Sequence, residues 1–100
     1  MESIKIEVQY FRGCPNSESV LNMVKNFVAT STLNLEFEEV LVESQEDAEK
    51  YKFRGSPTIL INGKDLEGLE ENKTPSLACR VYRSGLPTER DLKTFIENLN

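Results

Sequence analysis

The spacing of hydrophobic positions changes near the start of the chain, which predicts a strand followed by a helix. In residues 4–10 apolar side chains alternate with polar ones, as on a strand with one buried face. A turn at Arg12-Gly13 follows, and apolar residues then recur every three or four positions, which predicts a helix over about 15–29. The stripe of this helix consists of Val20, Leu21, Val24, Phe27 and Val28.

Residues 33–42, LNLEFEEVLV, predict a second strand whose apolar side chains change phase half-way along it. We therefore expect a bulge near residues 38–39. Ser44 fits the N-cap of a short helix, because acidic residues fill the turn after it. The apolar positions that change phase are Leu35, Phe37, Val40 and Val42.

The second half of the chain predicts two strands and a final helix. TILI, residues 58–61, is a continuous apolar run, as expected for a strand buried on both faces. An Asn-Gly turn follows it. After a long acidic stretch, ACRVYRS, residues 78–84, fits an edge strand, and the last helix begins near Thr88, directly after Pro87.

The element order is therefore β-α-β-α-β-β-α, which predicts an α/β fold. The first two strands, joined by a helix, should be parallel, and the last two should be antiparallel. Helices would cover both faces of one four-stranded mixed sheet. A chain of 100 residues forms one domain at this size, so we expect a single domain over 1–100, and a monomer.

Charge and composition exclude several classes of function. The net charge of −5 argues against a nucleic-acid partner, and no apolar run approaches the length of a membrane span. With no histidine and two separated cysteines, a zinc site is not expected, and we expect neither a metal nor a bound cofactor. MESIKIEVQYF lacks the basic and apolar regions of a signal peptide, so we expect a cytoplasmic protein with reduced thiols.

Cys14 stands directly before a proline and the predicted helix. Because proline favours the first helical position, we expect Cys14 to be the N-cap, where unpaired N–H groups and the helix dipole favour a thiolate. A thiolate is a nucleophile toward disulfides and other soft electrophiles. Ser17 could donate its hydroxyl to the sulfur, and Arg12 adds a positive charge that Glu18 partly opposes.

The alternative is that Cys14 is only a small buried apolar residue. Its polar neighbours Arg12, Asn16, Ser17 and Glu18 argue against that interpretation, because they are typical of a solvent-facing segment.

A second motif precedes the buried strand. In Arg54-Gly55-Ser56-Pro57-Thr58 the proline opens the strand, where it need not donate to the sheet. If the Ser56–Pro57 bond is cis, the chain turns a sharp corner and the backbone of Ser56 is free to pair with an extended peptide. Without special context a trans bond is expected.

The strand, GCPNS at the start of a helix, and RGSPTILING some forty residues later together resemble the thioredoxin/glutaredoxin fold. The resemblance covers nearly the whole chain. It is greatest to small bacterial and archaeal thioredoxin-like proteins with GCPN and CRVY segments, some of them associated with alkylmercury lyase. It implies that Cys14 is the nucleophile, Pro57 the cis-proline that faces it, and Ser56 the residue that pairs with the substrate.

The chain departs from this family at two points. Thioredoxins carry C-x-x-C, whereas the second cysteine is here replaced by Ser17, which favours a monothiol mechanism resolved by glutathione or another small thiol. The glutaredoxin signature for glutathione, a Gly-Gly pair followed by acidic residues, is replaced by Ser84-Gly85-Leu86-Pro87, which puts the use of glutathione in doubt.

Cys79 was the obvious alternative partner for Cys14, but strand spacing argues against it. If residues 84–85 lie beside Pro57, Cys79 sits about 16 Å down the strand, at roughly 3.3 Å per residue. A disulfide needs Cα atoms within about 7 Å. We therefore expect a structural role for Cys79. The connection over residues 63–77 is either a solvated acidic loop or a lid, and it could alter this register.

Three functions follow from these patterns. The first is a monothiol thiol-disulfide oxidoreductase acting on a thiol- or disulfide-containing protein or a small-molecule thiol. The second is a redox-inactive binding module on the same fold, and the third is handling of soft metals such as mercury. The candidate catalytic residues are Cys14 and Ser17. The candidate substrate-binding residues are Arg12, Pro15, Asn16, Ser56 and Pro57.

Overall fold

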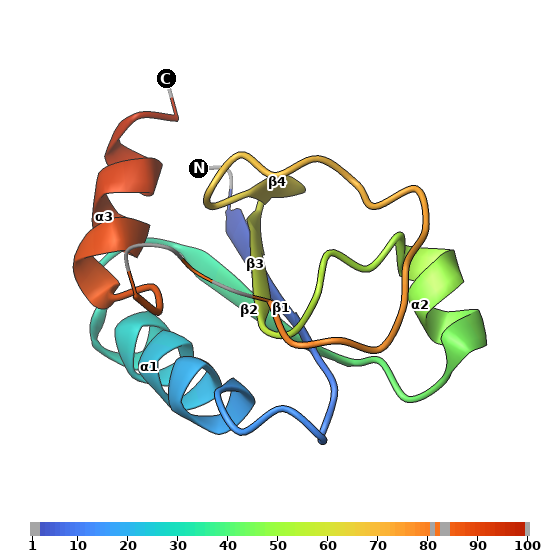
Figure 1. Cartoon of the computed structure of the whole chain (residues 1–100). Coiled ribbons are helices and arrows are strands. Elements are labelled where there is room, and N and C mark those ends of the chain that lie inside the picture. The colour runs from blue at the N-terminus through green and yellow to red at the C-terminus, as the bar shows by residue number, and fades with distance from the viewer. Residues whose placement is uncertain (1–2, 81, 83–84, 100) are drawn as a thin grey trace.

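A computed structural model of the chain describes residues 3–80, 82 and 85–99 (Figure 1). Its elements follow the predicted order of strands and helices. They are β1 (Ile4–Tyr10), α1 (Ser17–Thr30), β2 (Leu35–Leu41), α2 (Gln45–Tyr51), β3 (Thr58–Ile61), β4 (Lys64–Asp65) and α3 (Glu89–Glu97).

The strands form one mixed sheet in the order β2-β1-β3-β4. β1 runs parallel to β2 and antiparallel to β3, and β3 pairs antiparallel with β4. Figure 1 shows α1 and α3 together on one side of the sheet and α2 on the other. The predicted four-stranded α/β fold with helices on both faces is therefore confirmed.

The core follows from this layering. Side chains of β1 and β3 that pair across the sheet, such as Val8 and Ile59, face α1 and α3, and all four residues of β3 are buried. A smaller cluster of Val42, Ala48 and Phe53 packs at α2. The main cluster consists of Ile6, Val8, Val20, Leu21, Val24, Ile59, Ile61, Leu92 and Ile96.

The two predicted helix starts in the second half of the chain are confirmed. Ser44 caps α2, accepting a hydrogen bond from the backbone of Asp47. Thr88 caps α3, and its side chain and that of Asp91 bond reciprocally to each other's backbone N–H groups. Such caps satisfy N–H groups that have no partner within the helix.

The bulge expected in β2 is wrong. β1 and β2 pair without interruption from Ile4 with Leu35 to Tyr10 with Leu41. The phase of apolar residues changes because the sheet is covered on both faces: Phe37 packs on the main cluster, whereas Val40 packs on the cluster at α2. A continuous strand therefore explains the pattern.

The fourth strand lies earlier than expected. Asn62 and Gly63 both have positive φ, 51° and 83°, so they turn the chain back at once and β4 pairs with the end of β3. Of the predicted strand 78–84, Cys79 forms an isolated bridge, and residues 81, 83 and 84 lie outside the described part of the chain.

The loop between β4 and α3 is attached to the domain along its course. In Figure 1 it crosses from β4 to α2 and then returns past the end of β3. The side chain of Gln45 donates to the carbonyl of Pro75 at 2.7 Å, and the backbone N–H of Asn72 donates to Lys52 at 3.3 Å. These bonds bring the segment that follows, residues 78–80, back to the sheet.

Candidate active site around Cys14

Cys14 lies between the end of β1 and the start of α1, but it is not the N-cap of α1. The N-cap is Asn16, and α1 begins at Ser17. Cys14 instead starts a separate turn, in which the N–H of Ser17 donates to the Cys14 carbonyl at 3.3 Å. The expectation of an N-cap cysteine is therefore wrong by two residues, because Pro15 and Asn16 form this turn before the regular helix.

Cys14 is 3% exposed, and its sulfur lies against the carbonyl of Ser56. As a thiol it donates to the Ser56 carbonyl at 3.4 Å, and the Ser56–Pro57 peptide bond is cis. The backbone N–H of Asn16 and the hydroxyls of Ser17 and Ser56 lie near enough to the sulfur to lower the pKa of Cys14. The structure therefore brings together Cys14, Ser17, Ser56 and Pro57, which the sequence placed some forty residues apart.

The two serines form a buried pair beside the sulfur. Their Oγ atoms lie 2.7 Å apart, and the N–H of Phe11 donates to Ser56 Oγ at 3.1 Å. Ser17 can donate to the Phe11 carbonyl at 3.3 Å. When Cys14 loses its proton, the Ser17 hydroxyl can turn from that carbonyl to the sulfur while Ser56 continues to donate to Ser17.

These contacts set the pKa of the thiol. Burial alone raises the pKa of Cys14, because it removes water from the anion. The hydrogen bonds from Cys79, from the backbone of Asn16 and from the two serine hydroxyls outweigh burial, so the pKa lies below its ordinary value. Proton donors at the sulfur rather than an N-cap position of Cys14 thus favour the thiolate.

Cys79 is beside Cys14, contrary to the separation estimated from strand spacing. Cys79 forms a parallel bridge with Ser56, the residue whose carbonyl accepts from the Cys14 thiol, so the two thiols are close enough to shift each other's pKa. The interaction with the Cys14 thiol, followed by burial and the charge of Cys14, raises the pKa of Cys79. The estimate is wrong because it places residues 84–85 beside Pro57, whereas Cys79 itself pairs with Ser56, and residues 66–77 form a loop after the early β4.

An ion pair fixes the segment that carries Cys79. The Arg80 guanidinium contacts both carboxylate oxygens of Asp65, at 2.7 and 2.9 Å, with their side chains 7% and 2% exposed. Thr58 Oγ1 accepts a further bond from Arg80 at 3.3 Å. Such bidentate pairs are directional as well as strong, so they hold residue 79 in register with Ser56.

The remaining candidate residues lie on the exposed rim. Arg12, Pro15 and Asn16 are exposed, and both cysteines are free in the described chain, with Cys79 exposed. Arg12 lines a hollow of about 230 Å³ next to Cys14, together with Leu77 and four neighbours. Cys14 itself does not line this hollow, which is bordered by the preceding residue, Gly13.

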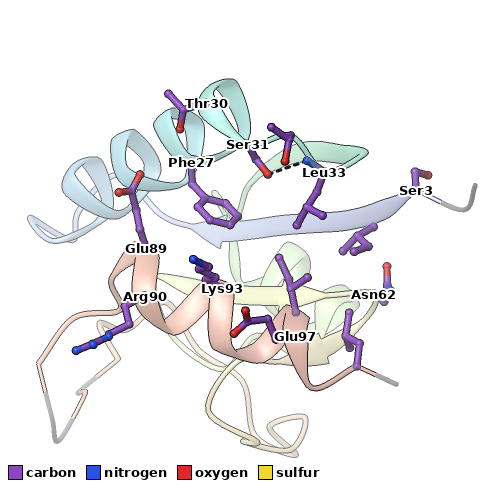
Figure 2. Close-up of a pocket in the computed structure, with 14 residues that line it drawn as sticks. Ser3, Phe27, Thr30, Ser31, Leu33, Asn62, Glu89, Arg90, Lys93 and Glu97 are labelled. Carbon is purple, nitrogen blue, oxygen red and sulfur yellow. Dashed lines mark hydrogen bonds between the residues drawn. The ribbon is translucent and has the colours of Figure 1, made fainter.

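A wider pocket, of about 1040 Å³, lies elsewhere in the domain. Figure 2 shows it between α1 and α3, where Phe27 and Leu33 point inward and Lys93 and Glu97 lie on the α3 side. It includes Ser3, at the opposite end of β1 from Cys14, and it contains none of the candidate residues. It plays no part in the chemistry of the thiols.

Two kinds of feature are absent among the described residues. No group of three or more histidine, cysteine, aspartate or glutamate side chains is arranged to hold a metal ion there. Among the helices that the structure describes, none combines the length and apolar character needed to cross a bilayer.

Comparison with known proteins supplies the family. The family model described as a thioredoxin domain matches residues 4–69. The chain belongs to the thioredoxin-domain family. The match covers the Cys14 turn and the Ser56-Pro57 corner of this thioredoxin domain, but it ends before Cys79. No curated protein matches the chain.

Sequence reasoning missed Cys79 as a member of the site. A signal was present: Asn-Gly between an apolar run and further residues is the strongest short hairpin pattern. Had β4 been placed directly after Asn62-Gly63, residues 66–77 would have been free to carry Cys79 back to the corner.

Proposed function

We propose that this thioredoxin domain carries out thiol-disulfide exchange with Cys14 as the nucleophile. The observation that carries the proposal is the ring of proton donors around the Cys14 sulfur, which holds its pKa below the ordinary value despite burial. The thiolate is the form that attacks a disulfide. The family match over residues 4–69 supports this chemistry.

Each neighbour has a distinct part in the reaction. Ser17 and the N–H of Asn16 stabilise the sulfur anion, both in the resting thiolate and when Cys14 leaves a mixed disulfide. Ser56, which precedes Pro57 through a cis peptide bond, places its carbonyl next to the sulfur. Arg12, Pro15 and Asn16 form the exposed surface that a substrate meets first.

The proposed substrate is a disulfide or thiol of a protein or a small molecule, and the proposed setting is the reducing cytoplasm. In that compartment both cysteines are kept as thiols between reaction cycles. Both hydrogen-bonding groups of the Ser56 backbone are already occupied by residues 78–80, so an extended peptide has to displace that segment before it can pair there.

The test is the rate of alkylation of Cys14 as a function of pH in the wild-type chain, followed on the Cys14 peptide by mass spectrometry so that Cys79 stays in place. We expect the Cys14 peptide to titrate with a midpoint below about 8.5, the ordinary thiol value. The Cys14→Ser variant is the blank. A midpoint at or above the ordinary value would contradict the proposal.

Binding of a soft metal ion is a second candidate, because Cys79 lies next to Cys14 and not about 16 Å from it as the strand spacing predicted. Two thiols in contact can provide two sulfur ligands to a thiophilic ion. We expect stoichiometric Hg²⁺ binding in competition with millimolar small thiol if this is a function, and loss of it in both single cysteine variants. Binding that survives Cys79→Ser would exclude a two-sulfur site.

A further inference from the structure

Residues Ala78–Arg80, which we term the strap, occupy the backbone edge of Ser56. The Ser56 N–H donates to the Ala78 carbonyl at 2.8 Å, and the Arg80 N–H donates to the Ser56 carbonyl at 2.8 Å. The strap therefore pairs with Ser56 as the backbone of an extended substrate would. Its central residue, Cys79, presents a thiol to Cys14.

The domain holds the strap in this register from two sides. Asp65 in β4 binds the Arg80 guanidinium through both carboxylate oxygens. Gly55 makes room for the strap: a Cβ at this position would lie 2.9 Å from Arg80 Cβ and 3.2 Å from its Cα. The contact between the two cysteines thus depends on specific side chains and a specific glycine.

We propose that Cys79 is the resolving cysteine of this domain, and that it replaces the second motif cysteine that Ser17 displaces. The proposal rests on the function proposed for Cys14. It concerns a residue beyond the part of the chain that the thioredoxin-domain model matches.

The reaction proceeds in two exchanges that balance. The Cys14 thiolate attacks a substrate disulfide, forms a mixed disulfide and releases one substrate thiolate. Cys79 then loses its proton to solvent and attacks Cys14 Sγ, forming the Cys14–Cys79 disulfide and releasing the second substrate thiolate. The substrate gains two electrons and the domain loses two, and an external dithiol returns the domain to its reduced state.

The electrostatics favour this order of events. In the resting state the Cys14 sulfur accepts the Cys79 hydrogen bond, which raises the pKa of Cys79 and keeps it protonated. Once Cys14 is part of a mixed disulfide it carries no charge, so that cause is removed and Cys79 ionises more readily. The second nucleophile is thus produced only after the first step.

The test is reaction with a small aliphatic disulfide, followed by intact-mass analysis and mapping of disulfide-linked peptides. We expect the wild-type chain to lose two hydrogens and to show a Cys14–Cys79 linked peptide in the monomer. Cys79→Ser should instead keep a stable adduct on Cys14, with at least about tenfold more adduct than wild type at the same time point.

A shifted-thiol variant supplies the matched control. Ala78→Cys/Cys79→Ser keeps one thiol in the strap, but neighbouring residues of an extended segment point in opposite directions. We expect this variant to keep the Cys14 adduct, as Cys79→Ser does. If a thiol at position 78 resolved the mixed disulfide on Cys14 at the wild-type rate, the pairing of residue 79 with Ser56 would not be required.

The outcomes separate the two proposals. If Cys79→Ser forms the Cys14 adduct and wild type keeps that adduct equally long, Cys79 is not the resolving cysteine, while Cys14 is still the nucleophile. Wild-type disulfides that link two chains rather than Cys14 and Cys79 of one chain also overturn the resolving role. If Cys14 reacts in neither protein, both proposals fall.

Discussion

At the scale of the residue, the chemistry of the site depends on a small set of hydrogen-bond donors near the Cys14 sulfur. Ser17 and Ser56 share a contact of 2.7 Å, and the hydroxyls of both lower the pKa of Cys14. The N–H of Asn16 and the Cys79 thiol supply the other bonds. A change at any one donor should therefore alter the Cys14 pKa measurably.

Ser17→Ala tests the serine. Removing the hydroxyl takes one hydrogen bond from the Cys14 thiolate, so the Cys14 pKa should rise. The ultraviolet absorbance of the thiolate measures this in a Cys79→Ala background. Ser19→Ala, an exposed serine of the same helix, is the control. Equal Cys14 pKa values in the two variants would show that Ser17 is only structural.

At the scale of the element, the position of the strap depends on β4, which is only two residues long. Asp65 holds Arg80, and the backbone N–H groups of Glu67 and Leu69 also donate to Asp65 Oδ1. This carboxylate therefore connects the hairpin after β3 to the strap that returns much later in the chain.

Asp65→Asn should release the strap. It leaves the buried Arg80 charge without its partner, which costs about 3–5 kcal/mol when the remaining charge stays buried. We expect a lower free energy of unfolding, measured by denaturant, and faster alkylation of Cys79. The double variant Asp65→Asn/Arg80→Gln should regain part of the free energy of unfolding, but its Cys79 should still be alkylated faster than in wild type. If the alkylation rate of Cys79 is the same as in wild type in both the single and the double variant, other contacts hold the strap in place.

Gly55→Ala tests the fit of the strap against a matched glycine. Gly55 and Gly68 both have positive φ, so alanine at either position carries a backbone cost of roughly 1–2 kcal/mol. Only at Gly55 does the new Cβ meet the strap, whereas nothing lies within 4 Å at Gly68. We expect slower Cys14–Cys79 disulfide formation in Gly55→Ala alone. Equal slowing in Gly68→Ala would indicate a general loss of stability.

The elements differ in how well their sequence predicts them. β1 and β3 show clear alternation or a continuous apolar run, and α2 and α3 carry capping residues, so local patterns suffice. β4 is short and polar, and its pairing depends on β3 rather than on its own residues. The position of Cys79 near Cys14 depends on a loop and on the Arg80–Asp65 ion pair, and neither produces a periodic pattern in the local sequence.

At the scale of the whole molecule, the segment after the strap is linked to the active-site corner. The Tyr82 hydroxyl donates to the Pro57 carbonyl, and the Arg80 guanidinium lies 4.7 Å from the centre of the Tyr82 ring. Burial raises the pKa of Tyr82 to about 12. The neutral phenol is therefore the form that the folded domain favours.

This shift predicts a loss of stability at alkaline pH. The pKa of Tyr82 is higher in the folded than in the unfolded chain, so its contribution is complete below about pH 10 and disappears as the pH rises to about 12. Denaturant unfolding across this range should show a steeper decline for wild type than for Tyr82→Phe. Tyr51→Phe, at a tyrosine of α2, is the control. If the stability of wild type and Tyr82→Phe declines in parallel, the Tyr82 hydroxyl does not contribute to the alkaline loss of stability.

The central claim is that a set of proton donors, including a second thiol, holds the Cys14 sulfur as an anion. The most direct measurement is a pH titration of both cysteines by ¹³Cβ chemical shift. We predict that Cys14 titrates first, with a midpoint below about 8.5, that Cys79 titrates later, and that Cys79→Ala raises the Cys14 midpoint. A Cys14 midpoint at or above the ordinary value, or a titration of Cys79 before Cys14, would contradict the account.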